Sequence, residues 1–131
     1  MWDTAGQEQY KSLTKNFYRN ANGIIIVFDL TNRKSFECVK DWMNNIREYA
    51  NKETKVALIG NKNDLEREVS EKECESLANS LKIKYFDCSA KENKGFKECV
   101  VSIVIDISQK INKEDEISLE SKKSEESRCF C

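Results

Sequence analysis

Histidine is absent from this chain of 131 residues, and no stretch of apolar residues is long. Without histidine, imidazole-based catalysis, a cysteine nucleophile paired with histidine and most zinc-enzyme sites are excluded. The longest apolar stretches, at 24–28 and 99–101, are far shorter than the roughly 20 residues that span a bilayer. The formal net charge is −1, so the excess of basic residues that would favour nucleic-acid binding is missing too.

Cysteine is present, but no C-x-x-C pair occurs. The six cysteines are at positions 38, 74, 88, 99, 129 and 131. They are scattered through segments with helical or strand periodicity, and the N-terminus has no apolar segment typical of a secretory signal. These features indicate reduced thiols in a cytosolic protein.

Segments with helical and strand periodicity alternate along the chain. A capping-box pattern at Ser70 and Glu73 marks the start of one helix, because the hydroxyl and the carboxylate each serve an unpaired N–H. The predicted helices are 10–19, 35–50, one after Ser70 that carries Leu77, Ala78 and Leu81, and 96–111; the predicted strands are 23–30, 55–60 and 83–87. Continuous apolar strands alternating with helices predict the α/β class, with a parallel sheet covered on both faces. In such sheets, ligands bind beyond the carboxyl ends of the strands.

Three polar loops are expected at that edge of the sheet: 3–7, 61–64 and 88–91. In the loop N-K-x-D, the carboxylate of Asp64 can accept hydrogen bonds from N1–H and N2–H of guanine, a pair of donors that adenine lacks. At roughly 1.5–3 kcal/mol for each charge-assisted bond, two such bonds discriminate by roughly 100-fold or more. The loop therefore predicts guanine recognition.

Neighbouring residues can complete that recognition. Asn61 can bond N7 of the base and tie the loops together, the stem of Lys62 can lie against the ring, and the N–H of Ala90 can bond O6. Taken alone, N-K-x-D is also typical of an ordinary turn. Its position after one buried strand, with S-A-K after the next, favours the guanine site.

The motifs D-T-A-G-Q-E at 3–8, N-K-N-D at 61–64 and S-A-K at 89–91 resemble those of the Ras-like small GTPases. Trp2 before the first motif, F-Y-R-N-A from 17, D-L-T from 29 and the ending C-F-C are similar to the Rab branch. The resemblance covers residues 2 to about 111 and the last three. It implies a partial three-layer α/β/α P-loop NTPase fold with three remaining parallel strands and flanking helices.

The resemblance also implies roles for individual residues. Asp3 would hold Mg²⁺ through water, the N–H of Gly6 would meet the γ-phosphate, and Gln7 would orient the attacking water as the catalytic residue. The other implied nucleotide-binding residues are Asn61, Lys62, Asp64, Ser89, Ala90 and Lys91. The implied function is a switch that binds GTP or GDP and hydrolyses GTP in vesicle traffic.

The phosphate-binding motif G-x-x-x-x-G-K-[ST] of this family has no counterpart in the sequence, whose four glycines are at 6, 23, 60 and 95. We therefore expect a chain that begins inside the domain and leaves the strand at 24–29 with an exposed apolar edge. Losing six phosphate contacts at ~1.5 kcal/mol each removes ~9 kcal/mol, so the polypeptide should bind GTP weakly or not at all. The alternative reading is a non-catalytic fragment or pseudo-GTPase that acts only as a protein-binding module.

Residues 1–111 are thus interpreted as the C-terminal two-thirds of a small GTPase domain, and 112–131 as a disordered tail. The acidic residues outnumber the basic ones in 112–128, so the tail is no polybasic anchor. Its end resembles the Rab signal for two geranylgeranyl groups, which implies lipidation of Cys129 and Cys131; two unmodified thiols are the alternative. Implied partners are a membrane on its cytoplasmic face, exchange factors, activating proteins, effectors and a prenyl-escort or GDP-dissociation inhibitor, with no nucleic acid.

Overall fold

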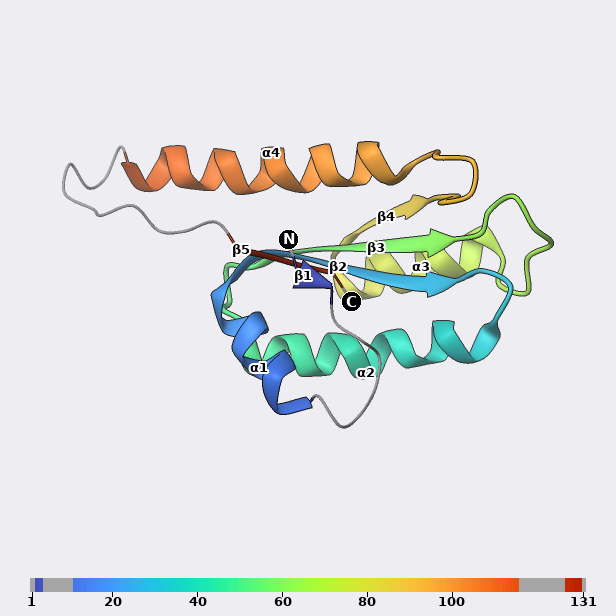
Figure 1. The fold of residues 1–131 in the computed structure, drawn as a ribbon, viewed down its shortest axis with the longest axis horizontal. Coiled ribbons are helices and arrows are strands. Elements are labelled where there is room, and N and C mark those ends of the chain that lie inside the picture. The colour runs from blue at the N-terminus through green and yellow to red at the C-terminus, as the bar shows by residue number, and fades with distance from the viewer. Residues whose placement is uncertain (1, 4–10, 116–126, 131) are drawn as a thin grey trace.

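The computed structural model describes residues 2–3, 11–115 and 127–130, with side chains from 16 to 113 (Figure 1). The described elements, in chain order, are β1 (Trp2–Asp3), α1 (Lys11–Asn20), β2 (Ala21–Asp29), α2 (Arg33–Tyr49), β3 (Lys55–Asn61), α3 (Glu71–Leu81), β4 (Lys84–Asp87), α4 (Phe96–Asp115) and β5 (Ser127–Phe130). The alternation of strand and helix through β4 and α4 confirms the predicted α/β class.

The described strands form one parallel sheet in the order β1-β5-β2-β3-β4. Strands β2, β3 and β4 are the three strands that the sequence predicts. Seven residue pairs join β2 to β3, from Gly23 opposite Lys55 to Asp29 opposite Asn61. This register brings the carboxyl ends of β2 and β3 level, and with them the loops that follow.

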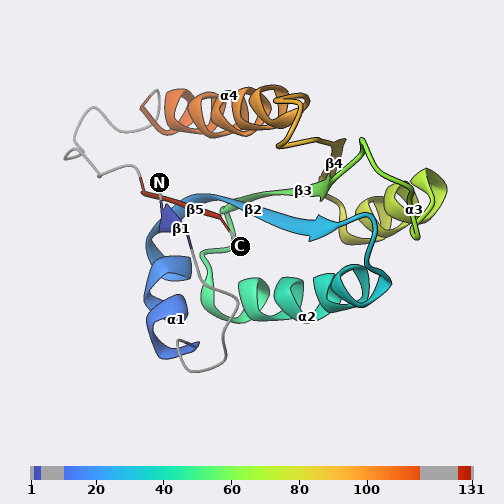
Figure 2. The ribbon, with the colours of Figure 1, turned by 45° about the vertical axis from the view of Figure 1, so that its right-hand side comes forward.

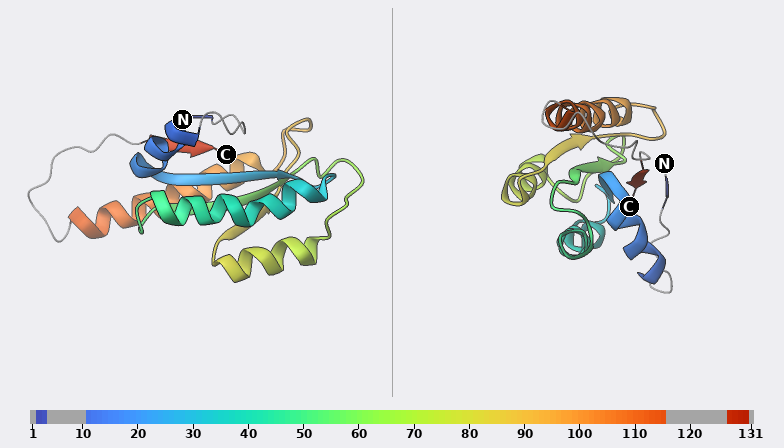
Figure 3. Two further views of the ribbon diagram at one scale, coloured as in Figure 1. Left: turned by 90° about the horizontal axis from the view of Figure 1, so that it is seen from below. Right: turned by 90° about the vertical axis from the view of Figure 1, so that its left-hand side faces the viewer.

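Helices cover both faces of the sheet, as Figures 2 and 3 show, with α4 on one face and α2 on the other. Alternate residues of β2 serve the two layers: Ile24 and Ile26 pack in the cluster with residues of α1, α2 and α3, while Ile25 packs with α4. The strand is therefore buried on both faces, as its continuous apolar sequence predicts. Val27 is the exception, with 37% of its surface exposed.

Local sequence signals set the helix boundaries. The side chain of Asn32 caps α2 by accepting hydrogen bonds from the N–H groups of Lys34 and Ser35. At α3 the predicted capping box is confirmed, because Ser70 and Glu73 each accept a hydrogen bond from the other's backbone N–H. These caps satisfy N–H groups that have no partner within the helix.

The turn into α4 requires glycine. Gly95 has a φ of +80°, and a Cβ there would lie 2.2 Å from the carbonyl oxygen of Asp87. No side chain fits so close an approach, since φ above zero already disfavours every residue with a Cβ. Gly95 thereby lets α4 begin directly beside the end of β4.

The structure differs from the expectations for the end of the chain. Helix α4 continues to Asp115 rather than ending at 111, and Ser127–Phe130 form β5 within the segment expected to be disordered. Strand β5 lies between β1 and β2, with Cys129 opposite both Trp2 and Ile24. The expected open edge of β2 is thus covered over Ala21–Ile25, with an irregularity between Ala21 and Gly23 that leaves Asn22 without a register partner. Residues 26–29 of β2 have no partner on that side among the described residues. The covering hydrogen bonds are backbone bonds, which depend little on side-chain identity, so the sequence pattern did not reveal them.

Candidate functional site

The loops after β3 and β4 lie side by side, as their positions in a parallel sheet predict. The N–H of Cys88 donates to the carbonyl of Gly60 at 2.8 Å, and the N–H of Asn63 donates to the carbonyl of Cys88 at 3.0 Å. Residues 61–64 and 88–91 therefore form one continuous surface at the carboxyl edge of the sheet.

A side-chain hydrogen bond joins Asp64 to Ser89 across this surface. The Ser89 hydroxyl donates to Oδ1 of Asp64 at 2.5 Å, and its oxygen accepts from the N–H of Glu92 at 3.2 Å. Ser89 is the one buried polar side chain of the described core, with 3% of its surface exposed. Its hydrogen bond is the main cause that lowers the pKa of Asp64, so this carboxylate is charged at neutral pH.

A second hydrogen bond ties Asn61 to the S-A-K loop. Oδ1 of Asn61 accepts from the N–H of Ala90 at 3.1 Å. This agrees with the expectation that Asn61 ties neighbouring loops together. It also engages the N–H that the sequence analysis assigned to guanine O6, so in this conformation Ala90 has no free donor. Lys91, the next residue, has a backbone N–H with no hydrogen-bond partner in the described part of the chain.

Lys62 has a left-handed backbone conformation, with a φ of 68°, which is uncommon for residues other than glycine. Its ammonium group lies 2.6 Å from Oδ2 of Asp29, at the end of β2. The head of the side chain is therefore fixed, while 49% of the side-chain surface remains exposed. An exposed stem held at both ends is suited to lie along a flat ring, which is the role that the sequence suggested.

Asp29 is a positioning residue that the sequence analysis did not identify. Its Oδ1 accepts from the N–H and the hydroxyl of Thr31 at 2.8 and 2.7 Å, and its other oxygen binds Lys62. Burial alone would raise the pKa of Asp29, but the hydrogen bonds from Lys62 and Thr31 lower it. The available signal was an aspartate two residues before a threonine at a strand end, which is typical of an Asx turn.

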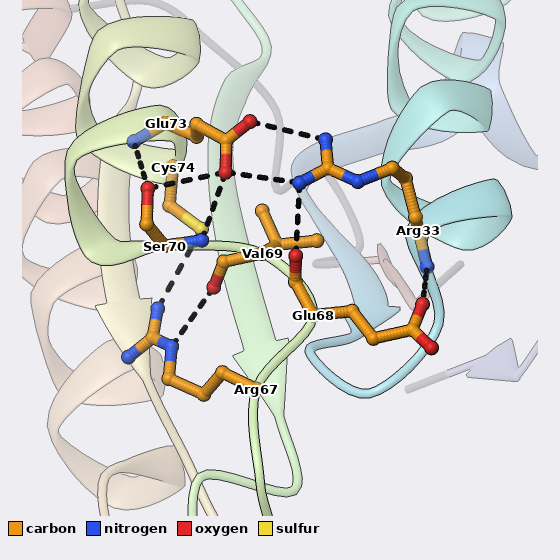
Figure 4. A network of polar contacts seen from close by, with 7 residues as sticks. All are labelled: Arg33, Arg67, Glu68, Val69, Ser70, Glu73 and Cys74. Atoms are coloured by element: carbon orange, nitrogen blue, oxygen red, sulfur yellow. Dashed lines mark hydrogen bonds and ion pairs between the residues drawn. The ribbon is translucent and has the colours of Figure 1, made fainter.

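The segment after the N-K-x-D loop is held by two arginines that the sequence analysis also missed (Figure 4). Arg67 donates to the carbonyl of Val69 at 3.0 Å and forms an ion pair with Asp87 at 3.1 Å. Arg33, at the start of α2, binds the carboxylate of Glu73 and the carbonyl of Glu68. These contacts join residues 67–73 to α2 and β4, so the segment that follows the N-K-x-D loop is anchored at its far end.

Several expected site residues fall outside the described side chains. Gly6, Gln7 and Cys131 lie outside the described residues altogether, and Asp3 and Cys129 are described only as backbone in β1 and β5. Their expected roles in phosphate, Mg²⁺ and lipid chemistry therefore stay predictions. Within the described residues, no group of three acidic, cysteine or histidine side chains could hold a metal, and no helix is long and apolar enough to span a bilayer.

Comparison with known proteins agrees with these motifs. Residues 1–109 match the model of the Ras family. The Ras-related protein RabC of Dictyostelium discoideum is 42% identical over 109 residues, which cover 82% of this chain and 56% of RabC. The bovine Ras-related protein Rab-8B is 40% identical over 115 residues, 86% of this chain and 56% of Rab-8B. Rab-1D of Dictyostelium discoideum is 39% identical, and its match covers 100% of this chain and 70% of Rab-1D.

Proposed function

The chain belongs to the Ras family of small GTPases and is Rab-like. We therefore propose that it acts as a GTP-dependent switch in vesicle trafficking. The chain spans just over half the length of the first curated relatives it matches, 56% in the case of RabC. Nucleotide binding, hydrolysis and partners are therefore proposed here. The observation that carries the proposal is the Ser89–Asp64 hydrogen bond, which holds a charged carboxylate at the carboxyl edge of the sheet.

The proposed guanine contact uses the remaining acceptor capacity of Asp64. A carboxylate offers about four acceptor positions, and Ser89 occupies one of those on Oδ1. N1–H and N2–H of guanine would donate to the others. Adenine has no such donors, so its binding would leave the charged Asp64 without those bonds at a cost of ~1.5–3 kcal/mol each.

The other edge of the base would meet donors from the same two loops. Asn61 uses its carbonyl oxygen for Ala90, which leaves its NH₂ group to donate to N7. The engaged N–H of Ala90 could reach O6 only by leaving Asn61, whereas the N–H of Lys91 has no partner among the described residues. We therefore propose Lys91 N–H as a donor to O6, with Lys62 covering the ring.

The phosphate chemistry is proposed from the family motifs alone. Asp3 would hold Mg²⁺ through water, Gly6 would donate its N–H to the γ-phosphate, and Gln7 would orient water for hydrolysis. Bound Mg²⁺ supplies positive charge that neutralises the β- and γ-phosphate oxygens. The second candidate function is a protein-binding module that does not bind nucleotide.

Lipidation of Cys129 and Cys131 is the proposed membrane attachment, with exchange factors, activating proteins and effectors as proposed partners. Cys129 lies in β5 with Ile24 and Trp2 as its neighbours across the sheet. A thioether-forming enzyme needs an extended, accessible peptide, so β5 would have to leave the sheet before this modification.

An NMR titration tests the guanine site in the 131-residue polypeptide. Two charge-assisted bonds without phosphate contacts predict a Kd for GDP on the order of millimolar, with shifted amides at 61–64 and 89–91 and no response to ADP. Asp64→Asn should abolish the response to GDP, because the amide NH₂ cannot accept a hydrogen bond from N2–H of guanine. It should introduce a response to xanthosine diphosphate, because the NH₂ can donate to the 2-oxo group of xanthine. Asn63→Ala, in an exposed side chain of the same loop, is the matched control.

Three results would count against the proposal or part of it. Equal responses to GDP and ADP, or shifts away from both loops, would remove the guanine site. No response at any concentration would favour the protein-binding module. Nanomolar binding of GTP would contradict the expected loss of phosphate contacts.

A further inference from the structure

Two adjoining cavities open at the end of the sheet opposite to loops 61–64 and 88–91. The larger, of about 510 Å³, is bounded by the last residues of α2 and α3 and the first residues of β3 and β4. The smaller, of about 110 Å³, lies beside the start of β2 and shares Asn51, Thr54 and Lys55 with the larger one. The shared residues make the two cavities one continuous surface.

The charged residues that line this surface are mostly basic. They are Arg19, Arg47, Lys52, Lys55, Lys82, Lys84 and Lys110, with Glu53 and Asp106 as the acidic ones. We call this set the basic end, and its net charge is +5. Because the formal charge of the whole chain is −1, the residues outside this set carry −6 in total.

Both carboxylates of the basic end are already paired. Lys84 binds Asp106 at 2.8 Å, and Lys110 binds Glu53. The other five cations make no ion pair within the part of the chain that the structure describes. Helices α1, α2, α3 and α4 all end on this side of the molecule, and their C-termini contribute roughly −0.5 of an elementary charge each, which is less than the charge of five cations.

The basic end faces away from the candidate guanine site. In Figure 1 the arrowheads of β2 and β3 point to one end of the molecule, and α4 runs back to the other. The described part of α4 ends there, and its last three residues, Lys113, Glu114 and Asp115, add one basic and two acidic residues. The chain that carries Cys129 and Cys131 therefore leaves α4 at the basic end.

We propose that the basic end docks on an anionic membrane surface and turns the guanine loops toward the cytosol. Lysines outnumber arginines in the set, which suits point-charge attraction to headgroups more than bidentate recognition of one phosphate. No aromatic residue lines either cavity, so the stacking that single-stranded nucleic acid uses is missing. The sequence of 112–128 is acidic and offers no net basic charge of its own, so electrostatic attraction to an anionic surface would come from the basic end of the folded domain. The cellular role rests on the proposed lipid-anchored function, but the attraction itself needs neither lipidation nor nucleotide.

Co-sedimentation with vesicles tests this surface on the unlipidated full chain. We expect binding to phosphatidylcholine vesicles with about one third phosphatidylserine, little binding to phosphatidylcholine alone, and loss of binding as salt increases. Neutralising one cation should lower the partition coefficient about 5-fold. The pair Lys52→Gln and Lys82→Gln, both in exposed side chains, should therefore lower it roughly 30-fold.

The matched control is Lys72→Gln with Lys97→Gln, which removes the same charge from exposed lysines in the first turns of α3 and α4. It should change the partition coefficient by less than about twofold. Equal losses for both pairs, or equal binding to both vesicle types, would overturn the proposal. Unchanged vesicle binding by the Lys52/Lys82 variant would overturn it as well and leave an acidic protein or RNA as the partner. Because no nucleotide is present, the result is independent of the GDP titration.

Discussion

The hydroxyl of Ser89 donates a hydrogen bond to Asp64 at 2.5 Å, although the two residues are 25 positions apart. The bond joins the loop after β3 to the loop after β4, and the 3.1 Å bond between Ala90 and Asn61 joins them again. The candidate guanine-binding surface is therefore organised before any ligand binds, which lowers the entropy cost of binding.

Replacing Ser89 by alanine should raise the pKa of Asp64 toward its ordinary value. The reason is that the hydroxyl's hydrogen bond is the main cause that lowers this pKa. Carboxyl-detected NMR titration of Asp64 measures the change. Ser76→Ala, an exposed position on α3, should leave the titration unchanged, and an identical Asp64 curve in Ser89→Ala would contradict the assigned hydrogen bond.

Stability should depend on pH through Glu73. Hydrogen bonds from Arg33, then from the backbone and hydroxyl of Ser70, lower the pKa of Glu73 to about 2 from the model-peptide value of 4.5. A lowered pKa in the folded state stabilises the protein fully above about 4.5, and the stabilisation is lost as the pH falls toward about 2. Glu73→Gln should thus lower the urea midpoint at pH 7, and the difference from the unmodified chain should shrink between pH 4.5 and 2.

The control for this experiment is Glu75→Gln, on the exposed side of the same helix. Its midpoint should follow that of the unmodified chain at every pH. If the urea midpoint of Glu73→Gln differs from that of the unmodified chain by the same amount at every pH, the Arg33–Glu73 pair does not stabilise the fold.

Gly95→Ala should destabilise the protein by about 1–3 kcal/mol or more, because positive φ is strained for alanine and the new Cβ would lie 2.2 Å from the carbonyl of Asp87. Urea unfolding measures the loss. The matched change is Asn93→Gly, at a φ of 54° in the same turn, where glycine relieves strain and should cost no more than about 0.5 kcal/mol. Equal losses in both variants would exclude the steric reason.

Removing residues 127–131 should expose the edge of β2 that β5 covers. Within Ala21–Ile25, the segment of β2 that faces β5, the amides that point toward β5 should exchange with solvent faster, while those that point toward β3 keep their partners. The amides of Cys74 and Leu77, buried in α3, should keep their protection. We also expect more aggregation, since a bare edge strand offers unpaired backbone groups to other chains. Unchanged exchange at every amide of Ala21–Ile25 would show that β5 does not protect this edge in solution.

Predictions from the sequence succeeded where the signal was local. The run of β-branched residues at 24–27 indicated a buried strand, and Ser70 with Glu73 indicated a helix start, because each depends on residues within one or two turns. N-K-x-D and S-A-K suggested loops with a shared role because parallel strands end at one edge. The clamp formed by Arg33 and the ion pair of Arg67 with Asp87 were missed, since their partners are 40 and 20 positions away.

By itself, the order of amino acids determined the alternation of strands and helices and the chemical character of the loops, because periodicity and short motifs are properties of neighbouring residues. Tertiary contacts alone decided that the donor of Ala90 is used by Asn61 and that Cys129 lies beside Ile24. They also gathered cations from separate helices and strands into one basic end of a chain whose net charge is only −1. Such juxtapositions depend on how distant segments pack, and a linear pattern of residues does not encode those distances.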